Sequence, residues 1–289
     1  EKPVLCISNF GSTNIVTIAS YIFGVPNRVN YLHTSPNQLK TDSKKNSLHD
    51  WFLIQRKILI LKINTHVITN SSMMSKLITK SFKIKKNKIS VLPYLLEKSK
   101  NNWRPFGKRD YNVCIVGRLS LSKGHKDLLY AFNDCINEFP KLKLLVVGDG
   151  SEKESLQKLT KTLNQKNRVI FLGNVANKDI GSIFSKCFAS ISASKSEAFG
   201  IVNIESLREG TPVICTKTEG SKDIIVDGKN GLNIDLSKKN DLAKKIALTL
   251  KDWGKYSEGA LRTFEKRYTK NNIPLHYKKI INSFKQKIK

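Results

Sequence analysis

Short apolar runs alternate with amphipathic stretches along most of this chain. Strand-like runs in the first hundred residues are VLCIS (4–8), RVNYLH (28–33), THVITN (65–70) and ISVLPY (89–94). The stretches between them have helical periodicity, over residues 14–24, 46–62 and 71–82. Strands that alternate with helices are typical of parallel sheets, so the pattern predicts the α/β class.

The alternation breaks at residues 96–111, a polar and charged stretch, and then restarts. Strands are predicted at residues 112–117, 169–173, 189–194 and 212–216, and a strand followed by a turn at residues 143–150. Helices are predicted at residues 123–139, 151–165, 176–187, 200–210 and 241–253, with a capping box at Ser151 and Glu154. Residues 221–234 are expected to hold a short helix and a turn. Residues 255–289 are expected to be helical, with an interruption near Pro274.

The break in the alternation suggests two domains. We expect a first domain at residues 1–97, a linker at 98–111 and a second domain at 112–265. Residues 266–289 are expected to form a helix that crosses back to the first domain.

The chain is strongly basic, with a net charge of +28 and a pI near 9.9. This charge favours an anionic partner, either nucleic acid, a phosphate-rich ligand or an anionic membrane surface. AT-rich coding, which favours Lys, Asn and Ile, is an alternative cause. The densest basic run is KIKKNK (83–88), which is either a solvated face or a membrane contact. A nucleic-acid-binding role is disfavoured, because no basic motif interleaved with aromatic residues is found.

The five cysteines form no C-x-x-C pair, and several lie in apolar runs. We interpret them as small core residues of a protein in a reducing compartment, with no disulfide framework and no zinc site. The sequence contains no apolar run of transmembrane length and no signal peptide.

Two carboxylates, Glu197 and Glu205, flank Gly200 in the stretch SEAFGIVNIES, where a helix is expected to begin. A helix N-terminus favours phosphate, and glycine permits close approach of a ligand. Carboxylates next to a phosphate make sense as acceptors for hydroxyl groups, as on a sugar and a ribose. The alternative is a capped surface helix with two solvated glutamates.

Two further stretches follow predicted strands. GRLSLSKGH places Arg118 and Lys123 where ligands bind in open α/β sheets, and two cations there can clamp a diphosphate. They can equally be solvated loop side chains. In VVGDGSEK the glycines Gly148 and Gly150 can admit a nucleotide. The third glycine of a dinucleotide fingerprint is replaced by Lys153, which disfavours a nicotinamide enzyme.

Taken in order, the motifs GRLS…KG, VVGDG, FLG, SKSEAFG-x-x-x-x-ES, GTPV and DGKNG resemble the C-terminal domain of family-4-type retaining glycosyltransferases. The resemblance covers roughly residues 112–250. It implies the GT-B fold, in which two Rossmann-like domains with parallel sheets face each other across a cleft. Family members begin with a strand and a glycine-rich loop that this chain lacks, so the first domain is expected to be truncated.

The resemblance also implies roles for individual residues. Glu197 would contact the donor sugar, Glu205 the ribose, and Arg118 with Lys123 the diphosphate. The donor site would be completed by Gly117, Gly148, Phe199, Gly200, Ile201 and Val202. His33, at the end of a predicted strand, would approach the donor sugar and join Glu197, Arg118 and Lys123 as a catalytic residue. An ordinary polar histidine at a strand end is the alternative.

The expected function is therefore transfer of a sugar from a nucleotide diphosphate sugar, a UDP-sugar, to a hydroxyl acceptor with retention of the anomeric configuration. The acceptor would be a glycan or glycolipid in bacterial surface polysaccharide or lipid-linked glycan synthesis. No Asp-x-Asp pair is present, so no metal and no cofactor are expected. The protein would be cytoplasmic, at the inner face of the plasma membrane. Alternatives are an inactive or incomplete sugar-nucleotide-binding relative and a sugar-nucleotide epimerase of the same architecture.

Overall fold

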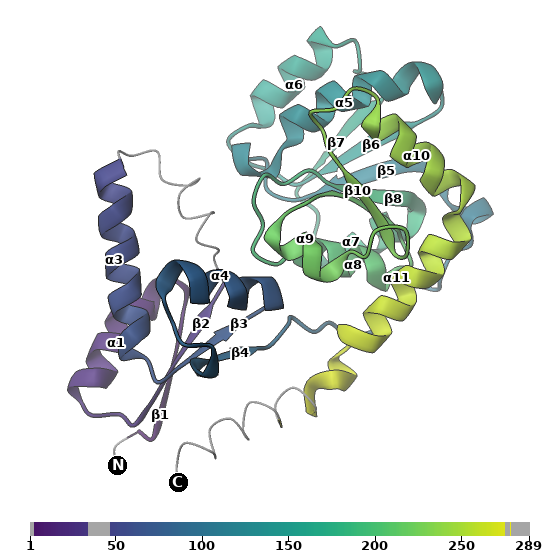
Figure 1. The fold of residues 1–289 in the computed structure, drawn as a ribbon. Helices are drawn as coiled ribbons and strands as arrows, with labels where there is room; N and C mark the ends of the chain where they lie inside the picture. The colour runs from purple at the N-terminus through teal and green to yellow at the C-terminus, as the bar shows by residue number, and fades with distance from the viewer. Residues whose placement is uncertain (1–2, 34–46, 275–277, 279–289) are drawn as a thin grey trace. The chain divides into compact units, whose positions relative to one another are not determined.

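The computed structural model describes residues 3–33, 47–274 and 278, with only the backbone described at 47–50. The chain divides into two compact units, and each is described by itself. The first unit comprises residues 1–94, 196–199 and 273–289, and the second comprises residues 95–195 and 200–272. Each unit contains one sheet of parallel strands (Figure 1). The predicted α/β class is confirmed.

The sheet of the first unit has its strands in chain order, β1-β2-β3-β4. The strands are β1 (Leu5–Asn9), β2 (Asn27–Leu32), β3 (His66–Thr69) and β4 (Ile89–Val91). The helices are α1 (Thr13–Ile22), α3 (Ser47–Ile63) and α4 (Ser72–Phe82), with short 3₁₀ turns η1 (Phe10–Ser12) and η2 (Lys86–Lys88). Every strand and helix predicted for this part of the chain is present.

The core of the first unit lies around β3, which is buried along its whole length, as expected for an inner strand of a parallel sheet. Val67 of this strand packs with Leu61 of α3 and with Met74 and Ile78 of α4. The α4 helix starts at Ser71, whose hydroxyl accepts a hydrogen bond from the Met74 amide. A local cap and an apolar face therefore fix this helix on the sheet.

Helix α1 turns its hydroxyl-bearing side, and not its apolar side, towards the sheet. Thr13 and Thr17 are buried, and the Asn30 amide of β2 donates a hydrogen bond of 3.2 Å to the Thr13 hydroxyl. Ile15 and Ile22 on the other side are 76% and 71% exposed. An ordinary surface helix turns its apolar stripe to the core and its polar side to water. Hence α1 carries an exposed apolar face.

The second unit has a six-stranded parallel sheet of order β10-β9-β8-β5-β6-β7. Its strands are β5 (Asp110–Val116), β6 (Lys143–Val147), β7 (Val169–Gly173), β8 (Cys187–Ser192), β9 (Val213–Thr216) and β10 (Gly231–Ile234). Its helices are α5 (His125–Glu138), α6 (Lys153–Thr162), α7 (Asn177–Lys186), α8 (Ile201–Arg208), α9 (Glu219–Ile224), α10 (Asp241–Lys251) and α11 (Trp253–Arg267). The 3₁₀ turns are η3 (Phe106–Lys108), η4 (Leu121–Lys123) and η5 (Lys270–Asn272).

Both faces of this sheet are covered by helices. Alternate residues of β5 point to opposite faces: Val113 and Ile115 pack with α5, α6 and α10, whereas Cys114 packs with Ile180 and Phe184 of α7. Figure 1 shows α5, α6 and α10 on one side of the sheet and α7, α8 and α11 on the other. The chain adds β6 and β7 on one side of β5 and then returns to add β8, β9 and β10 on the other. The strand order therefore reverses between β5 and β8.

Two local predictions were wrong. The capping box at Ser151 and Glu154 does not form, because the amides of Glu152 and Lys153 donate to the carbonyls of Leu119 and Gly150. These bonds hold the turn, and α6 begins only at Lys153 with no side-chain cap. Residues 221–234 also contain a strand, β10, that the prediction of a helix and a turn left out.

The segment that breaks the alternation is packed within the second unit. The Trp103 indole donates to the Ser257 hydroxyl at 3.2 Å. The Arg109 guanidinium lies 4.9 Å from the ring centre of Trp253 and donates to the carbonyls of Phe184, Cys187 and Glu209. Desolvation lowers the pKa of Arg109 to about 10, so it is charged at neutral pH. This stretch is therefore held in place by specific side chains.

The five cysteines are free thiols. Four of them are buried, which confirms the interpretation as core residues for these four, whereas Cys6 is only half-buried. In the described part of the chain, no helix has both the length and the apolar character needed to cross a bilayer. Of the predicted C-terminal helix 266–289, residues 275–277 and 279–289 lie outside the described residues.

Candidate active site

The carboxyl ends of β5 and β8 are where the strand order of the second unit reverses. In open α/β sheets such a reversal opens a crevice in which ligands bind. The loop after β5 carries Gly117, Arg118 and Lys123, and the loop after β8 leads to Gly200 at the start of α8. The topology therefore brings most of the predicted donor residues to one end of one sheet.

Three loops at this end are packed backbone to backbone. The Leu119 amide donates to the Asp149 carbonyl, and the Lys195 amide donates to the Ser122 carbonyl. Gly148 has a φ of +130°, and a β-carbon there would lie 2.0 Å from the carbonyl oxygen of Gly117. A side chain is sterically excluded at that distance, so the contact requires glycine. The loops after β5, β6 and β8 thus form one rigid rim.

Arg118 and Lys123 are the two cations that the loop after β5 adds to this rim. Arg118 is exposed, and its side chain has no hydrogen-bond or ion-pair partner among the described residues. Lys123 ends the 3₁₀ turn η4 and is half-buried, and its δ-carbon lies 4.0 Å from where a β-carbon on Gly117 would stand. Both side chains are placed to meet an anion at the end of β5.

An ion pair, which the sequence analysis missed, ties the rim to α5. The Lys195 ammonium lies 2.9 Å from the Asp127 carboxylate. Lys195 directly precedes the stretch that holds Glu197, and Asp127 lies in the first turn of α5. A lysine and an aspartate 68 positions apart carry no sequence signal, and only the fold brings them together.

Helix α8 starts at the rim without a side-chain cap. Gly200 is its N-cap residue, with a φ of +87° that favours glycine, and it has no side chain of its own to cap the amides of the first turn. Uncapped amides and the helix dipole favour an anion at this point. Behind it, the Ser206 hydroxyl bonds to Ser190 of β8 at 2.7 Å and to the Thr211 carbonyl at 2.9 Å, which anchors α8 to the sheet.

Glu205 lies on the second turn of α8 and is half-buried. Desolvation raises its pKa, and the positive charge of Arg208 opposes that shift. No hydrogen bond or ion pair to its carboxylate is found among the described residues. A half-buried carboxylate without a partner has unused capacity to accept hydrogen bonds, and hydroxyl groups are suitable donors.

Three of the remaining predicted residues, Glu197, Phe199 and His33, belong to the first unit. Glu197 and Phe199 lie in segment 196–199, and Phe199 is 3% exposed, with its ring edge-on to Tyr94 at 5.2 Å. His33 directly follows β2, and burial lowers its pKa, so its ring is neutral at physiological pH. Ile201 and Val202, which open α8, belong to the second unit with Gly200.

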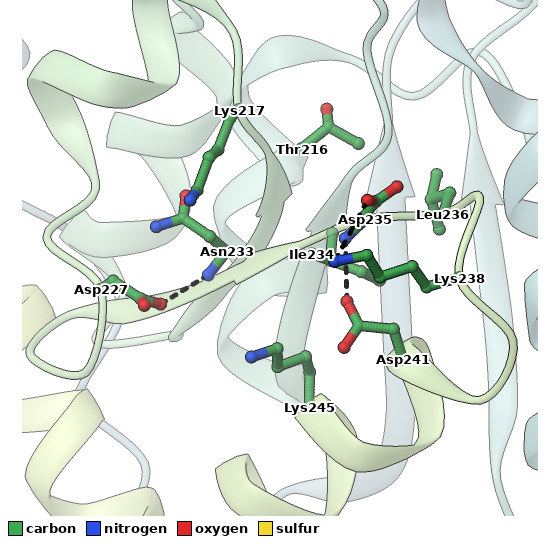
Figure 2. A pocket seen from close by; sticks show the side chains of 10 residues that line it. All are labelled: Thr216, Lys217, Asp227, Asn233, Ile234, Asp235, Leu236, Lys238, Asp241 and Lys245. Atoms are coloured by element: carbon green, nitrogen blue, oxygen red, sulfur yellow. Dashed lines mark hydrogen bonds and ion pairs between the residues drawn. The ribbon is translucent and has the colours of Figure 1, made fainter.

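The structure also contains a pocket that the sequence analysis did not predict (Figure 2). It has a volume of about 480 Å³ and lies at the carboxyl ends of β9 and β10. Three aspartates and three lysines line it, together with Asn233 and Thr216: Asp227, Asp235, Asp241, Lys217, Lys238 and Lys245. All three aspartates accept hydrogen bonds from backbone amides: Asp227 from Asn233, Asp241 from Asp235, and Asp235 from Ser237. None of the predicted donor residues lines this pocket.

Within residues 3–33, 51–274 and 278, no group of three or more His, Cys, Asp or Glu side chains is arranged to hold a metal ion.

Comparison with known proteins places these features in a family. The family described as Glycosyl transferases group 1 matches residues 97–267. A poly(glycerol-phosphate) alpha-glucosyltransferase of Bacillus subtilis is 32% identical over 167 residues, which is 56% of this chain and 24% of that relative. An uncharacterized glycosyltransferase of Methanocaldococcus jannaschii is 28% identical over 239 residues, 78% of this chain and 58% of that protein. The chain thus spans well under two thirds of the length of these relatives.

A solved structure extends the likeness to nearly the whole chain. Anabaena Alr3699/HepE, crystallised with UDP and glucose, matches 97% of this chain and 78% of its own, with a TM-score of 0.78 at 21% identity. At this identity the likeness shows only that the two proteins share a fold, and that fold is GT-B. Because the family match covers more than half of its residues, this chain belongs to the glycosyl transferases group 1 family.

Proposed function

We propose that this chain transfers a sugar from a UDP-sugar to a hydroxyl acceptor and retains the configuration at the anomeric carbon. The observation that carries the proposal is the rim of the second unit. Two cations and an uncapped helix start lie at the strand reversal, and the same helix carries a half-buried carboxylate without a partner among the described residues. Cations and free amides suit a diphosphate, and a carboxylate suits a sugar or ribose hydroxyl.

The proposed roles follow from this arrangement. Arg118, Lys123 and the start of α8 at Gly200 stabilise the negative charge that develops on the diphosphate as the anomeric bond breaks. Glu205 accepts hydrogen bonds from the ribose. Gly117 and Gly148 keep side chains out of the path of the nucleotide. We assign the donor-binding role to residues 112–265 as a domain.

The contacts to the donor sugar are proposed for Glu197 and His33, with Phe199, Ile201 and Val202 around the phosphate and sugar. The acceptor role is assigned to residues 1–97. The acceptor that we propose is a glycan or a glycolipid with free hydroxyl groups, in bacterial surface polysaccharide or lipid-linked glycan synthesis. The Bacillus subtilis relative is named for poly(glycerol-phosphate), which supports a polymer as the acceptor. The UDP bound in the Anabaena structure supports UDP as the nucleotide. We further propose that the protein works on the cytoplasmic side of the plasma membrane, bound peripherally.

Calorimetric titration with UDP, GDP and ADP tests the donor site. We expect UDP to bind most tightly and Glu205→Ala to weaken this binding. Glu154→Ala is the matched control, because Glu154 is an exposed glutamate on α6. Equal binding of UDP to the wild type and to the Glu205 variant would remove Glu205 from the site.

Release of UDP from UDP-glucose, measured with and without acceptor, then tests catalysis. Slow release without acceptor that accelerates with a glycan or glycolipid is the expected result. Tight UDP binding without release from any UDP-sugar would instead favour the inactive relative.

A further inference from the structure

The His33 ring is enclosed on both faces by aromatic rings of its own unit. Phe10 stacks on one side at a centroid distance of 4.2 Å and an interplanar angle of 8°. Tyr31 stacks at 4.3 Å and 5°. Phe10 is held at a φ of +48°, in the left-handed region that bulky residues rarely adopt. This stacking fixes the plane of the imidazole, so its two nitrogens keep fixed directions.

Each nitrogen of His33 has a different neighbour. Nε2 lies 3.1 Å from the side-chain oxygen of Asn9, which can only accept a hydrogen bond. Nδ1 is hydrogen-bonded to the Tyr94 hydroxyl. The Asn70 side chain also hydrogen-bonds to the Tyr94 phenol and stabilises its ionised form, so it donates to the phenolic oxygen. The Tyr94 proton is thereby left to point at Nδ1.

We propose that Tyr94 is a positioning residue that fixes His33 as the neutral tautomer with its proton on Nε2. The hydrogen bonds then run in one direction, from Asn70 to Tyr94, from Tyr94 to Nδ1 and from Nε2 to Asn9. The hydrogen bonds at the two ring nitrogens require the same tautomer, because the Asn9 oxygen needs a donor at Nε2 and the Tyr94 hydroxyl donates to Nδ1.

The tautomer decides what His33 can offer a ligand. Tyr94 is half-buried, whereas Asn9 is exposed. The Nε2 proton is therefore the polar site that a ligand can reach, by replacing the Asn9 oxygen. Resting on the function proposed above, this assigns to His33 the role of hydrogen-bond donor to a hydroxyl oxygen of the donor sugar. A histidine with its proton on Nδ1 would offer an acceptor instead.

Nitrogen-15 NMR of histidine-labelled protein tests the assignment without any ligand. The neutral wild type is expected to give a pyridine-like Nδ1 and a pyrrole-like Nε2 signal for His33, identified by their loss in His33→Gln. Tyr94→Phe removes the donor to Nδ1, so a mixture of tautomers and protonation at a higher pH are expected. Tyr31→Phe is the matched control, because its hydroxyl donates to the Leu92 carbonyl at 2.7 Å and not to His33.

A pyrrole-like Nδ1 in the wild type, or identical His33 signals and titration in Tyr94→Phe, would overturn the proposal. Circular dichroism of the variants establishes that they are folded.

Turnover of UDP-glucose provides the second measurement. If His33 acts as a donor to the sugar, Tyr94→Phe should lower kcat/KM about tenfold, the typical effect of losing one hydrogen bond, with the loss growing as the pH falls. Tyr94→Phe kinetics equal to wild type at every pH would contradict the positioning role. A wild type with the predicted NMR signals but no turnover would contradict the proposed function while the tautomer stands, so the two failures are distinguishable.

Discussion

Gly148 and Gly117 meet so closely that the carbonyl oxygen of Gly117 occupies the space of a side chain on Gly148. A β-carbon there would lie 2.0 Å from that oxygen and 2.9 Å from the carbonyl carbon. The two glycines follow β6 and β5, whose carboxyl ends adjoin in the sheet. Their contact fixes the position of the loop after β5, which carries Arg118 and Lys123, relative to the end of the sheet.

Replacing Gly148 with alanine should therefore displace this loop. We expect a loss of about 2 kcal/mol or more in the free energy of unfolding, from the steric clash and the φ of +130°. UDP binding should weaken in parallel. Denaturant unfolding and calorimetry measure the two effects. Gly254→Ala on α11 is the control, since nothing lies within 4 Å of the position that its β-carbon would take and no loss is expected.

Glu205→Gln should separate binding from stability. The folded-state pKa of Glu205 is raised, so its contribution to stability is full at acid pH and is lost as the pH rises through that pKa. Glutamine does not ionise, so the variant does not lose this stability as the pH rises. It should be more stable than the wild type at pH 7 but not at pH 4. UDP affinity should fall about tenfold at pH 7, because glutamine accepts hydroxyl hydrogen bonds less strongly than a carboxylate.

Thermal unfolding of Glu205→Gln and wild type across this pH range tests the prediction. A variant less stable than the wild type at pH 7 would show that the carboxylate has a partner that stabilises it.

His125 should make the fold sensitive to acid. It is 4% exposed, neither ring nitrogen has a partner among the described residues, and the side chains around it on α5, β5, β6, β7 and α6 are apolar. Desolvation, together with the charge of Lys123, lowers its pKa to about 4. The neutral His125 ring therefore makes its full contribution to the free energy of unfolding above pH 6.5. This contribution is lost as the pH falls towards 4, and the loss is about 3 kcal/mol at pH 4.

His125→Leu should remove this component of acid destabilisation and leave the neutral-pH stability equal or higher, since it also removes two unsatisfied buried nitrogens. Urea unfolding at pH 7 and pH 4 gives the difference. The same acid loss in variant and wild type would exclude His125 as its source.

Glu209 should be far more important for stability than an exposed glutamate. It is 3% exposed and accepts hydrogen bonds from Ser99 at 2.6 Å, Asn101 at 3.1 Å and Arg208 at 2.9 Å. Glu209→Ala leaves the largely buried Arg208 guanidinium without its carboxylate, at a cost of about 3–5 kcal/mol. Glu265→Ala breaks only an exposed pair with Lys98 and should cost under about 1 kcal/mol. Comparable losses for both would contradict this difference.

The basic run at residues 83–88 should bind anionic membranes. Lys83, Lys85 and Lys86 are exposed, while Ile84 between them is buried. Liposomes with anionic lipid should sediment the protein at low salt and release it above about 0.3 M salt, where screening shortens the range of surface charges. Changing Lys85 and Lys86 to glutamate should abolish sedimentation. Binding that persists in this variant would assign the contact to another surface.

Most strands and helices of the fold could be predicted from the sequence, because buried parallel strands appear as short apolar runs between amphipathic helices. It failed at β10, where only four residues form the strand after a turn. It failed at Ser151 because the local capping signal competes with the hydrogen bond from the Glu152 amide to the carbonyl of distant Leu119, which no local pattern encodes.

For the site, the motifs indicated which residues to examine, and the strand order explains why those of the second unit lie together. The partners of His33 could not be found in the same way. Asn9 and Tyr94 lie 24 and 61 positions away, and each directly follows or ends an apolar run without any recognisable spacing. Only the order of the strands β1 to β4 in the sheet brings them to one ring.

Helix α1 has a practical consequence for work with this protein. Since Thr13 and Thr17 make its contacts with the sheet, Ile15 and Ile22 contribute no core packing to the described fold. These two positions can accept glutamate or lysine at little cost to folding. They are therefore the first places to alter if the purified chain is to be kept monodisperse at the concentrations that NMR and crystallisation require.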